Sequence, residues 1–129
     1  MIIEKTHNKP FVNLSIEDCI FEIRGSSFSK SVTELYIEIL KWIDQEIPKL
    51  DGELKCSFYF DVINSISLRN IMEIFNKFSK YQDKGKHFNV TWHYDIDDED
   101  NLENAESLSE IFNLPMTIKE TVKKGVISD

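Results

Sequence analysis

Residues 54–80 of this chain read LKCSFYFDVINSISLRNIMEIFNKFSK, and the hydrophobic period changes part-way along this stretch. Apolar and polar residues alternate over Leu54–Asp61, which predicts a strand with one buried face. Beyond it, apolar residues recur at three- and four-residue spacing, which predicts a helix over Ser65–Tyr81. The predicted apolar stripe of that helix is Leu68, Ile71, Met72, Phe75 and Phe78. Between strand and helix lies Asn64–Ser67, whose small polar side chains suit a helix N-terminus.

The rest of the chain alternates between strand and helix patterns in the same way. Strands are predicted at 11–15, 18–23, 87–94 and 116–122, and further helices at 31–47 and from the acidic run 95–100 to about residue 113. The order β-β-α-β-α-β-α-β predicts an α/β fold whose sheet is mostly parallel, with right-handed crossovers and an antiparallel N-terminal hairpin. Residues 1–10 are expected to be a lead-in, and 24–30 a loop.

The composition indicates one folded domain over residues 1–129, with an ordered core at about 11–122 and a frayed tail from Lys123. The chain is 41% hydrophobic and 12% aromatic, as in an ordered globule. It contains neither an apolar run of roughly 20 residues nor a signal-peptide pattern, so a cytoplasmic location without membrane contact is expected. Cys19 and Cys56 lie in strand-like patterns without metal-ligand spacing, and both are predicted to be buried free thiols.

The formal net charge of −8 argues against nucleic-acid binding, because most of this surface would repel a phosphate backbone. It favours instead a protein partner that carries a basic patch.

No residue pattern indicates catalysis or a bound cofactor. The three histidines are scattered, and with four glycines in the chain a glycine-rich phosphate loop is hard to place. Asp95, Asp97 and Glu99 have the first spacings of a calcium loop, but Asp100 stands where that loop needs glycine. We therefore expect no enzyme activity, no cofactor and no metal site.

Two interpretations of the acidic run remain open. The positive end of a helix dipole stabilises nearby carboxylates, so the acidic run can simply begin a solvated helix. Its carboxylates are Asp97, Asp98, Glu99 and Asp100. They can also form, with Trp92 and Tyr94, a recognition surface for a basic partner. The alternation of the 87–94 strand favours core packing for Trp92.

The turn Asn64–Ser67 also has two interpretations. Asn64 or Ser65 can cap the helix and do nothing more. Alternatively, a serine hydroxyl at this exposed strand–helix turn can accept a phosphate, which backbone N–H groups and the nearby Arg69 would accommodate.

Three motifs resemble those of the SiaC-type regulatory phosphoproteins. The segment Asn64–Arg69 resembles the family's Asn-Thr-Ser-Ser motif with its following Lys. The segment Trp92–Asp100, with Glu103 and Glu106 beyond it, resembles a Trp-x-Tyr motif followed by acids. Gly25–Ser27 and the later Tyr36–Trp42 resemble a Gly-x-Ser turn before a helix with Tyr and Trp. The resemblance covers roughly residues 11–120.

This resemblance implies a fold similar to the STAS-like anti-sigma-factor antagonists, and control by partner switching. In the family, a Ser/Thr kinase phosphorylates the residue after the Asn, and a PP2C-type phosphatase removes the phosphate. The unmodified form binds and activates a diguanylate cyclase, which raises cyclic di-GMP and promotes biofilm or aggregation. By position the acceptor is Ser65, with Ser67 as a second candidate and Asn64 and Arg69 as supporting residues.

The chain departs from the family motif in three ways: Ser65 replaces Thr, Ile66 replaces the next Ser, and Arg69 replaces Lys. The alternative function is a small ligand-binding domain or enzyme whose site is the same turn, Asn64–Ser67.

Overall fold

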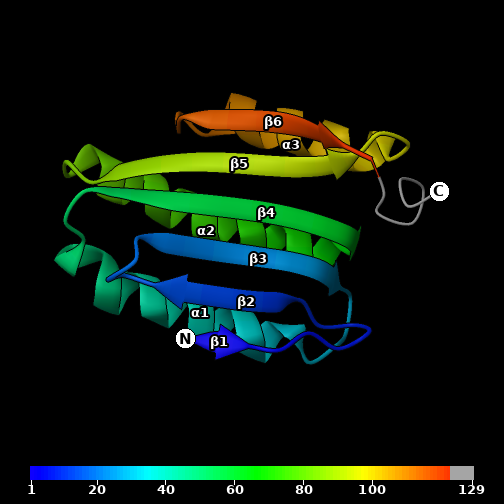
Figure 1. Ribbon diagram of the computed structural model, residues 1–129, viewed down its shortest axis with the longest axis horizontal. Helices are drawn as coiled ribbons and strands as arrows, with labels where there is room; N and C mark the ends of the chain where they lie inside the picture. The colour runs from blue at the N-terminus through cyan, green and yellow to red at the C-terminus, as the bar shows by residue number, and fades with distance from the viewer. Residues whose placement is uncertain (123–129) are drawn as a thin grey trace.

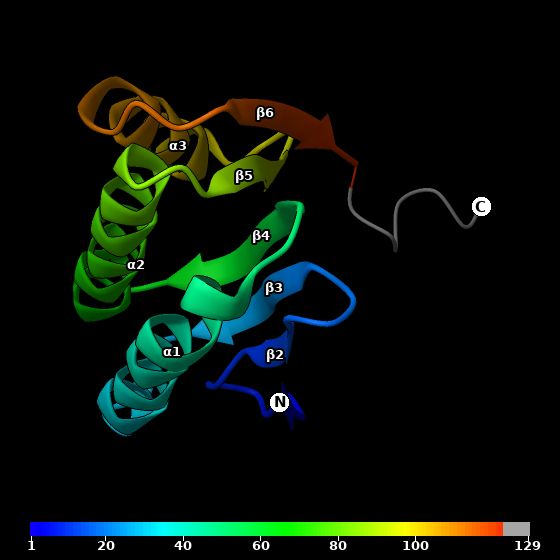
Figure 2. The same ribbon diagram turned by 90° about the vertical axis from the view of Figure 1, so that its left-hand side faces the viewer.

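The computed structural model describes residues 1–122, which form one six-stranded sheet with three helices on a single face (Figures 1 and 2). The strands lie side by side in sequence order; β3 to β6 run parallel, and the pairs β1–β2 and β2–β3 are antiparallel. Figure 2 shows the opposite face of the sheet without a helix. The elements are β1 (Ile2–Ile3), β2 (Phe11–Ser15), β3 (Ile20–Ser27), α1 (Val32–Glu46), a 3-10 turn (Ile47–Lys49), β4 (Glu53–Ile63), α2 (Ser65–Asp83), β5 (His87–Asp95), α3 (Glu99–Ile111) and β6 (Met116–Thr121).

This arrangement follows from the alternation of strands and helices. Each helix connects two neighbouring parallel strands, and crossovers of one hand place all three helices on the same face. The predicted α/β order with an antiparallel N-terminal hairpin is confirmed. The short strand β1 adds to it: Ile2 and Ile3 pair with Asn13 and Val12, so the structured region begins before residue 11.

Strand β4 lies in the middle of the sheet, between β3 and β5. The four alternating residues of its predicted apolar face are at most 2% exposed: Leu54, Cys56, Phe58 and Phe60. Their burial raises the pKa of the Cys56 thiol well above its ordinary value. The intervening residues Lys55, Ser57 and Tyr59 point to the open face.

Helix α2 packs on the sheet through a stripe that differs in part from the prediction. Ile71, Phe75 and Phe78 are fully buried as expected, but Met72 is 36% exposed and Leu68 only partly buried. The missed positions are Ser67 and Ile74, which are completely buried. Spacings of four, three, one and three residues from Ser67 follow the 3.6-residue period more closely than the predicted stripe does. Because this stripe starts with a polar residue, Ser67, the pattern of apolar residues does not indicate its register.

Aromatic rings fill the layer between sheet and helices. Phe58 of β4 stacks on Trp92 of β5 with ring centroids 5.5 Å apart, and Phe75 of α2 lies 5.3 Å from Phe58. Phe78 contacts Phe21 on β3 and Phe88 on β5 at 5.0 and 4.6 Å between centroids. Such offset and tilted pairs add to the free energy of burial, so α2 is held on three strands at once.

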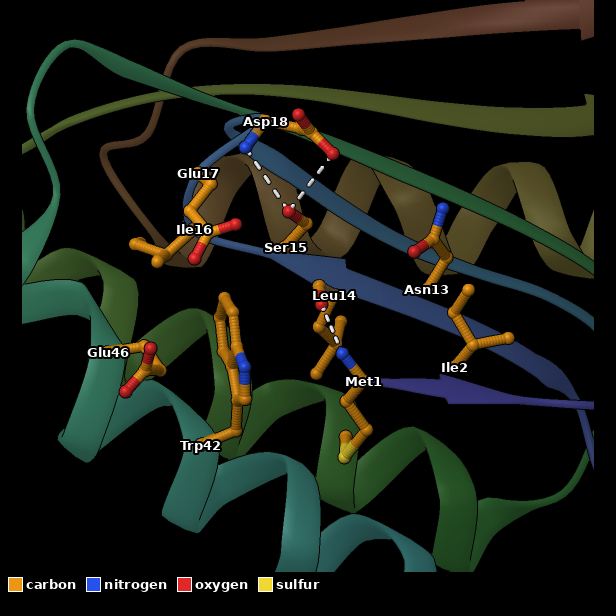
Figure 3. A pocket seen from close by; sticks show the side chains of 10 residues that line it. All are labelled: Met1, Ile2, Asn13, Leu14, Ser15, Ile16, Glu17, Asp18, Trp42 and Glu46. Atoms are coloured by element: carbon orange, nitrogen blue, oxygen red, sulfur yellow. Dashed lines mark hydrogen bonds between the residues drawn. The ribbon is translucent and has the colours of Figure 1, made fainter.

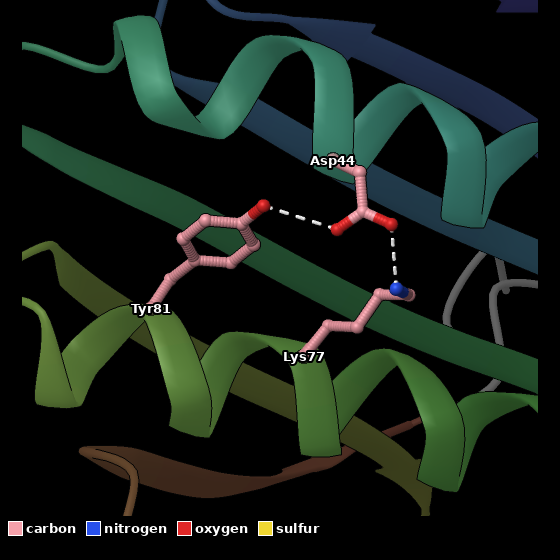
Figure 4. A network of polar contacts seen from close by, with 3 residues as sticks. All are labelled: Asp44, Lys77 and Tyr81. Carbon is pink, nitrogen blue, oxygen red and sulfur yellow. Dashed lines mark hydrogen bonds and ion pairs between the residues drawn. The ribbon is translucent and has the colours of Figure 1, made fainter.

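Helices α1 and α2 are also joined by a polar contact at the surface (Figure 4). Lys77 Nζ lies 2.6 Å from Asp44 Oδ2, and the Tyr81 hydroxyl donates to Asp44 Oδ1 at 3.0 Å. The hydrogen bond from Lys77 lowers the pKa of Asp44. Because the Asp44 side chain is about half exposed, this pair contributes little to stability and mainly orients the two helices.

The predictions for residues 19–30 are corrected. The expected loop 24–30 is strand as far as Ser27, because Ser26 and Ser27 pair with Val62 and Ile63 on the long strand β4. Gly25, with φ of +111°, marks a register shift rather than a turn. Cys19 lies in the turn that precedes β3, with φ of +57°, and is only partly buried. Residues 123–129, where a frayed tail was expected, lie outside the described part of the chain.

No helix within residues 1–122 is long and apolar enough to cross a membrane.

We predict that Phe75→Ala lowers the free energy of unfolding by about 3–5 kcal/mol, because it leaves a cavity between β4, α2 and Trp92. Met72→Ala, on the solvent side of the same helix, should lower it by less than about 1 kcal/mol. Urea unfolding monitored by circular dichroism measures both. Equal losses in the two variants would contradict this assignment of the buried face.

Candidate functional site

The candidate site is the turn at which β4 passes into α2. Asn64 is the N-cap residue: its backbone is extended, and its side-chain oxygen accepts a hydrogen bond from the Ser67 N–H at 2.8 Å. Its amide nitrogen donates to the carbonyl of Phe28 at 3.3 Å, and its backbone N–H donates to the carbonyl of Ser27 at 3.1 Å. Asn64 therefore caps α2 and attaches the start of that helix to the end of β3.

The two serines of this turn lie in opposite environments. Ser65 is the first residue of α2 and its side chain is exposed. Ser67, two residues further along the same turn, has no exposed surface. Arg69 is exposed and follows Ser65 by four residues, the spacing at which side chains on one helix face are neighbours.

The Ser67 hydroxyl belongs to a buried chain of three hydroxyl groups. It donates to the carbonyl of Ser27 at 2.8 Å and accepts from the Ser27 hydroxyl at 2.8 Å. Tyr36 of α1 lies 2.9 Å from the same Ser27 hydroxyl. Each hydroxyl has one hydrogen, and Ser27 gives its hydrogen to Ser67, so Tyr36 must be the donor to Ser27. The chain runs from Tyr36 through Ser27 and Ser67 to a backbone carbonyl, and it connects α1, β3 and α2.

Burial extends the pH range over which this chain stays neutral. Desolvation raises the pKa of Tyr36 to about 12, although the nearby hydroxyls of Ser27 and Ser67 oppose the rise. Tyr36 is thus a neutral hydroxyl donor across the physiological pH range, and the direction of the chain does not change with pH there.

The acidic run begins α3, as one of its two interpretations expected. Asp98 is the N-cap, and its carboxylate accepts from the Asn101 N–H at 3.1 Å. Asp97, Glu99 and Asp100 are exposed. The positive end of the helix dipole stabilises their negative charges, and their outward position leaves them accessible to a partner.

The two aromatic candidates of this segment, Trp92 and Tyr94, lie in different environments. Trp92 has no exposed surface, and its indole N–H donates to Asn101 Oδ1 at 3.1 Å. Trp92 is therefore a core residue, as the strand alternation indicated, buried between α2, α3 and the sheet, and its alternative role as a partner contact is corrected. Tyr94 is partly exposed, and its hydroxyl donates to Glu120 Oε1 at 3.3 Å.

A hollow of about 210 Å³ joins the start of α3 to the end of β4. Asp61 and Val62 line it from β4, and Asp98, Asp100 and Asn104 line it from the other side. Val62 lies three residues before Ser65, so the acidic hollow borders the serine turn. The structure thus brings the two predicted site segments, Asn64–Arg69 and Asp97–Asp100, to one edge of the sheet.

Three residues of this region were not predicted as functional: Ser27, Tyr36 and Asn101. The Gly25–Ser27 motif and Tyr36 do carry a signal, because both belong to the motifs quoted above. Their contact with Ser67 depends on the packing of α1 beside α2, which sequence periodicity does not specify. Asn101 gives no such signal, since a polar residue in an acidic segment is ordinarily exposed.

A second hollow, of about 320 Å³, lies at the β1–β2 edge of the sheet and is lined in part by Trp42 and Glu46 of α1 (Figure 3). Trp42 is partly buried against Phe21, at 5.9 Å between ring centroids. Among residues 1–122, no group of three or more His, Cys, Asp and Glu side chains is placed to hold a metal ion.

The model of the family described as SiaC family regulatory phosphoprotein matches residues 3–121. This chain belongs to the SiaC family. A curated relative, an uncharacterized protein of Pseudomonas aeruginosa strain UCBPP-PA14, is 21% identical over 117 residues, which is 91% of this chain and 93% of the relative.

Solved structures of SiaC proteins share the fold. The crystal structure of apo-SiaC from Pseudomonas aeruginosa matches with a TM-score of 0.82 and 21% identity, over 92% of this chain and 97% of that one. SiaC in the crystal structure of diguanylate cyclase SiaD in complex with its activator SiaC, from the same organism, matches with a TM-score of 0.87 and 21% identity, over 94% and 99%. The one-sided sheet described above is therefore the fold of the SiaC family.

We predict that Ser67→Ala destabilises this SiaC-family protein by about 1–3 kcal/mol, because it leaves the buried Ser27 hydroxyl without its acceptor. Ser65→Ala, which removes an exposed hydroxyl from the same helical turn, should change stability by less than about 0.5 kcal/mol. Urea unfolding of the two variants measures the difference. A loss in Ser65→Ala as large as that in Ser67→Ala would contradict the hydroxyl chain.

Proposed function

We propose that this protein is a phosphorylation-controlled binding protein that catalyses no reaction itself. In its unphosphorylated form it binds and activates a diguanylate cyclase and so raises cyclic di-GMP. A Ser/Thr kinase modifies Ser65 and thereby weakens this complex, and a PP2C-type phosphatase reverses the modification. The observation that carries the proposal is the exposed Ser65 at the start of a capped, firmly anchored helix, in a chain of the SiaC family.

Accessibility favours Ser65 over Ser67 as the acceptor. A kinase must seat the acceptor hydroxyl in its own active site, and Ser65 needs no unfolding to present it. Ser67 would first have to break two buried hydrogen bonds and leave the core. Ser65 also matches the acceptor position of the family motif.

The partner surface we propose surrounds Ser65 at the carboxyl edge of the sheet. Three large apolar side chains are 40–50% exposed there: Phe28, Val62 and Ile66. Phe28 is held beside the turn by the hydrogen bond from Asn64. Val62 lies three residues before Ser65, and Ile66 directly follows it. Exposed apolar side chains that lie close together are typical of protein interfaces.

Charge defines the kind of partner. The carboxylates of Asp61, Asp98 and Asp100 line the hollow next to this apolar group, with Asp97 and Glu99 exposed beside them. An apolar centre with an acidic border fits a partner surface that carries apolar side chains surrounded by Lys or Arg. Tyr94 lies on the neighbouring strand and is the remaining aromatic candidate for this contact.

Phosphorylation would oppose such a complex without disrupting the fold. It adds about −1.5 to −2 charges at Ser65, next to the acidic border. The amide groups of the first α2 turn and Arg69 can accommodate this charge in the free protein. In the complex the same group would be enclosed among apolar contacts, where desolvation of an anion is costly.

The choice of partners is supported by relatives rather than by this chain alone. The solved complex of SiaC with the diguanylate cyclase SiaD pairs a protein of this fold with such an enzyme. The family description as a regulatory phosphoprotein supports a kinase and a phosphatase acting on the chain. We propose a cytoplasmic location for this switch, because its kinase needs ATP.

We predict that Ser65→Ala binds the cyclase constitutively and loses most phosphate incorporation by the kinase. Ser65→Asp should weaken binding, though less than phosphorylation does, because one charge replaces about two. Calorimetry measures binding, and intact-protein mass spectrometry measures incorporation. Ser109→Ala, which removes an exposed serine near the end of α3, is the matched control and should behave as wild type.

Full labelling of Ser65→Ala, with loss of label in Ser67→Ala, would overturn the choice of acceptor. If neither substitution affected labelling or binding, the turn would be a helix cap only. A small molecule that bound saturably at Asn64–Ser67 would then favour the alternative of a ligand-binding domain or enzyme.

We predict that the triple variant Asp97→Asn, Glu99→Gln, Asp100→Asn associates more slowly with the cyclase, with a weaker dependence of the association rate on salt. Asp98 stays unchanged because it caps α3. The matched control neutralises three exposed carboxylates elsewhere, Glu17→Gln, Glu38→Gln and Asp51→Asn. Stopped-flow association rates at several salt concentrations compare the two variants. Equal rates in both would assign the effect to net charge and not to this surface.

A further inference from the structure

The open face of the sheet carries a hollow of about 280 Å³ that has no part in the function proposed above. It lies over β4, β5 and β6, on the face without helices (Figure 2). The side chains that line it on this face are Lys55, Ser57, Asn89, Thr91, His93 and Lys119.

The strand register arranges these side chains in rows across the three parallel strands. Lys55 pairs with Asn89, Ser57 pairs with Thr91, and His93 pairs with Lys119. The hydroxyl groups of Ser57 and Thr91 therefore form the middle of the floor, and the two lysines lie at opposite corners. Each lysine lies one strand, about 4.8 Å, and two residues, about 6.6 Å, from Thr91. Lysine side chains are long and flexible, so both ammonium groups can reach one ligand above Thr91.

The hollow has the opposite sign of charge from most of the molecule. No carboxylate lines it, although the chain has a net charge of −8. Three acids lie near it on this face: Glu22 pairs with Ser57 and is bonded to Arg24 Nε at 3.3 Å, Asp95 is bonded to the Tyr59 hydroxyl, and Glu53 is exposed two residues before Lys55 on β4. Within residues 1–122, neither Lys55 nor Lys119 forms an ion pair. A basic hollow among acidic surroundings attracts anions selectively.

Two further features suit an anion with several oxygen atoms. Ser57, Thr91 and Asn89 can each donate a hydrogen bond from the floor. Burial and the neighbouring Lys119 lower the pKa of His93, so its ring is neutral at neutral pH and can also donate.

We propose that this hollow is a binding site for a small oxyanion of two negative charges, in which Lys55 and Lys119 neutralise the charge and the Ser57 and Thr91 hydroxyls hold oxygen atoms. A phosphate group and a dicarboxylate share this chemistry. The site lies on the open face, away from the Ser65 turn at the edge of the sheet, and the proposal does not depend on the function of that turn.

The test is titration of the full chain, labelled with ¹⁵N, with methyl phosphate and in parallel with succinate at constant ionic strength. We expect saturable shifts of amide signals on the β4–β6 rows around Ser57 and Thr91 in at least one of the two series. The ligand whose shifts saturate at the lower concentration identifies the ligand class. Lys55→Gln and Lys119→Gln should each weaken binding about five-fold. Lys41→Gln, an exposed lysine of α1 on the other side of the molecule, is the control and should bind as wild type.

Three results would overturn the proposal. One is the absence of saturable shifts with both ligands. Another is an equal loss of affinity in Lys41→Gln, which indicates a general charge effect. The third is a set of shifts centred on the first-turn amides of α2, which would place the anion at the helix N-terminus instead. Circular dichroism of the lysine variants confirms that they are folded, so a loss of binding in them is interpretable.

Discussion

The buried hydrogen bonds at the start of α2 are the constraint on which the rest of the site depends. Ser67 donates to the carbonyl of Ser27, accepts from the Ser27 hydroxyl, and through it is joined to Tyr36 of α1. Asn64 caps the same turn from outside. Together they fix the first turn of α2 in position and rotation, since a polar group left unpaired in this core would cost more than the bond contributes. Ser67 faces inward as a result, and Ser65, two positions earlier, faces the solvent.

The one-sided sheet gives this anchoring a use. With all helices on one face, the core is a single layer between sheet and helices. Helix α2 lies across the middle of this layer and contacts β3, β4 and β5 through its Phe75 and Phe78. The carboxyl ends of the parallel strands converge at the edge where α2 and α3 begin. That edge therefore collects the serine turn, the exposed apolar side chains and the acidic border in one surface. The face of the sheet that carries no helix takes no part in this surface.

Much of this could be predicted from the sequence, because the signals were local. Alternation over Leu54–Asp61, a helical stripe after it and the small polar turn between them led to the correct strand, helix and cap. The misses were tertiary. Gly25 and Ser26 have turn composition, yet their segment continues as a strand because β4 is long enough to pair with it. Ser67 begins the buried stripe although it is polar, because the carbonyl and the hydroxyl of Ser27 on β3 satisfy its hydroxyl. The core position of Trp92 followed from the strand alternation, but Asn101, which accepts from its indole N–H, is a partner that no periodicity indicates.

The most direct measurement of the central claim is site mapping of the phosphate by tandem mass spectrometry on the protein isolated from its own cells. The peptide that contains both serines should carry the phosphate on Ser65, with fragment ions that leave Ser67 unmodified. This result follows if the buried hydroxyl chain keeps Ser67 inaccessible while the capped helix presents Ser65. Phosphate on Ser67, with Ser65 unmodified, would contradict the account, because it would require the anchored turn to open for the kinase.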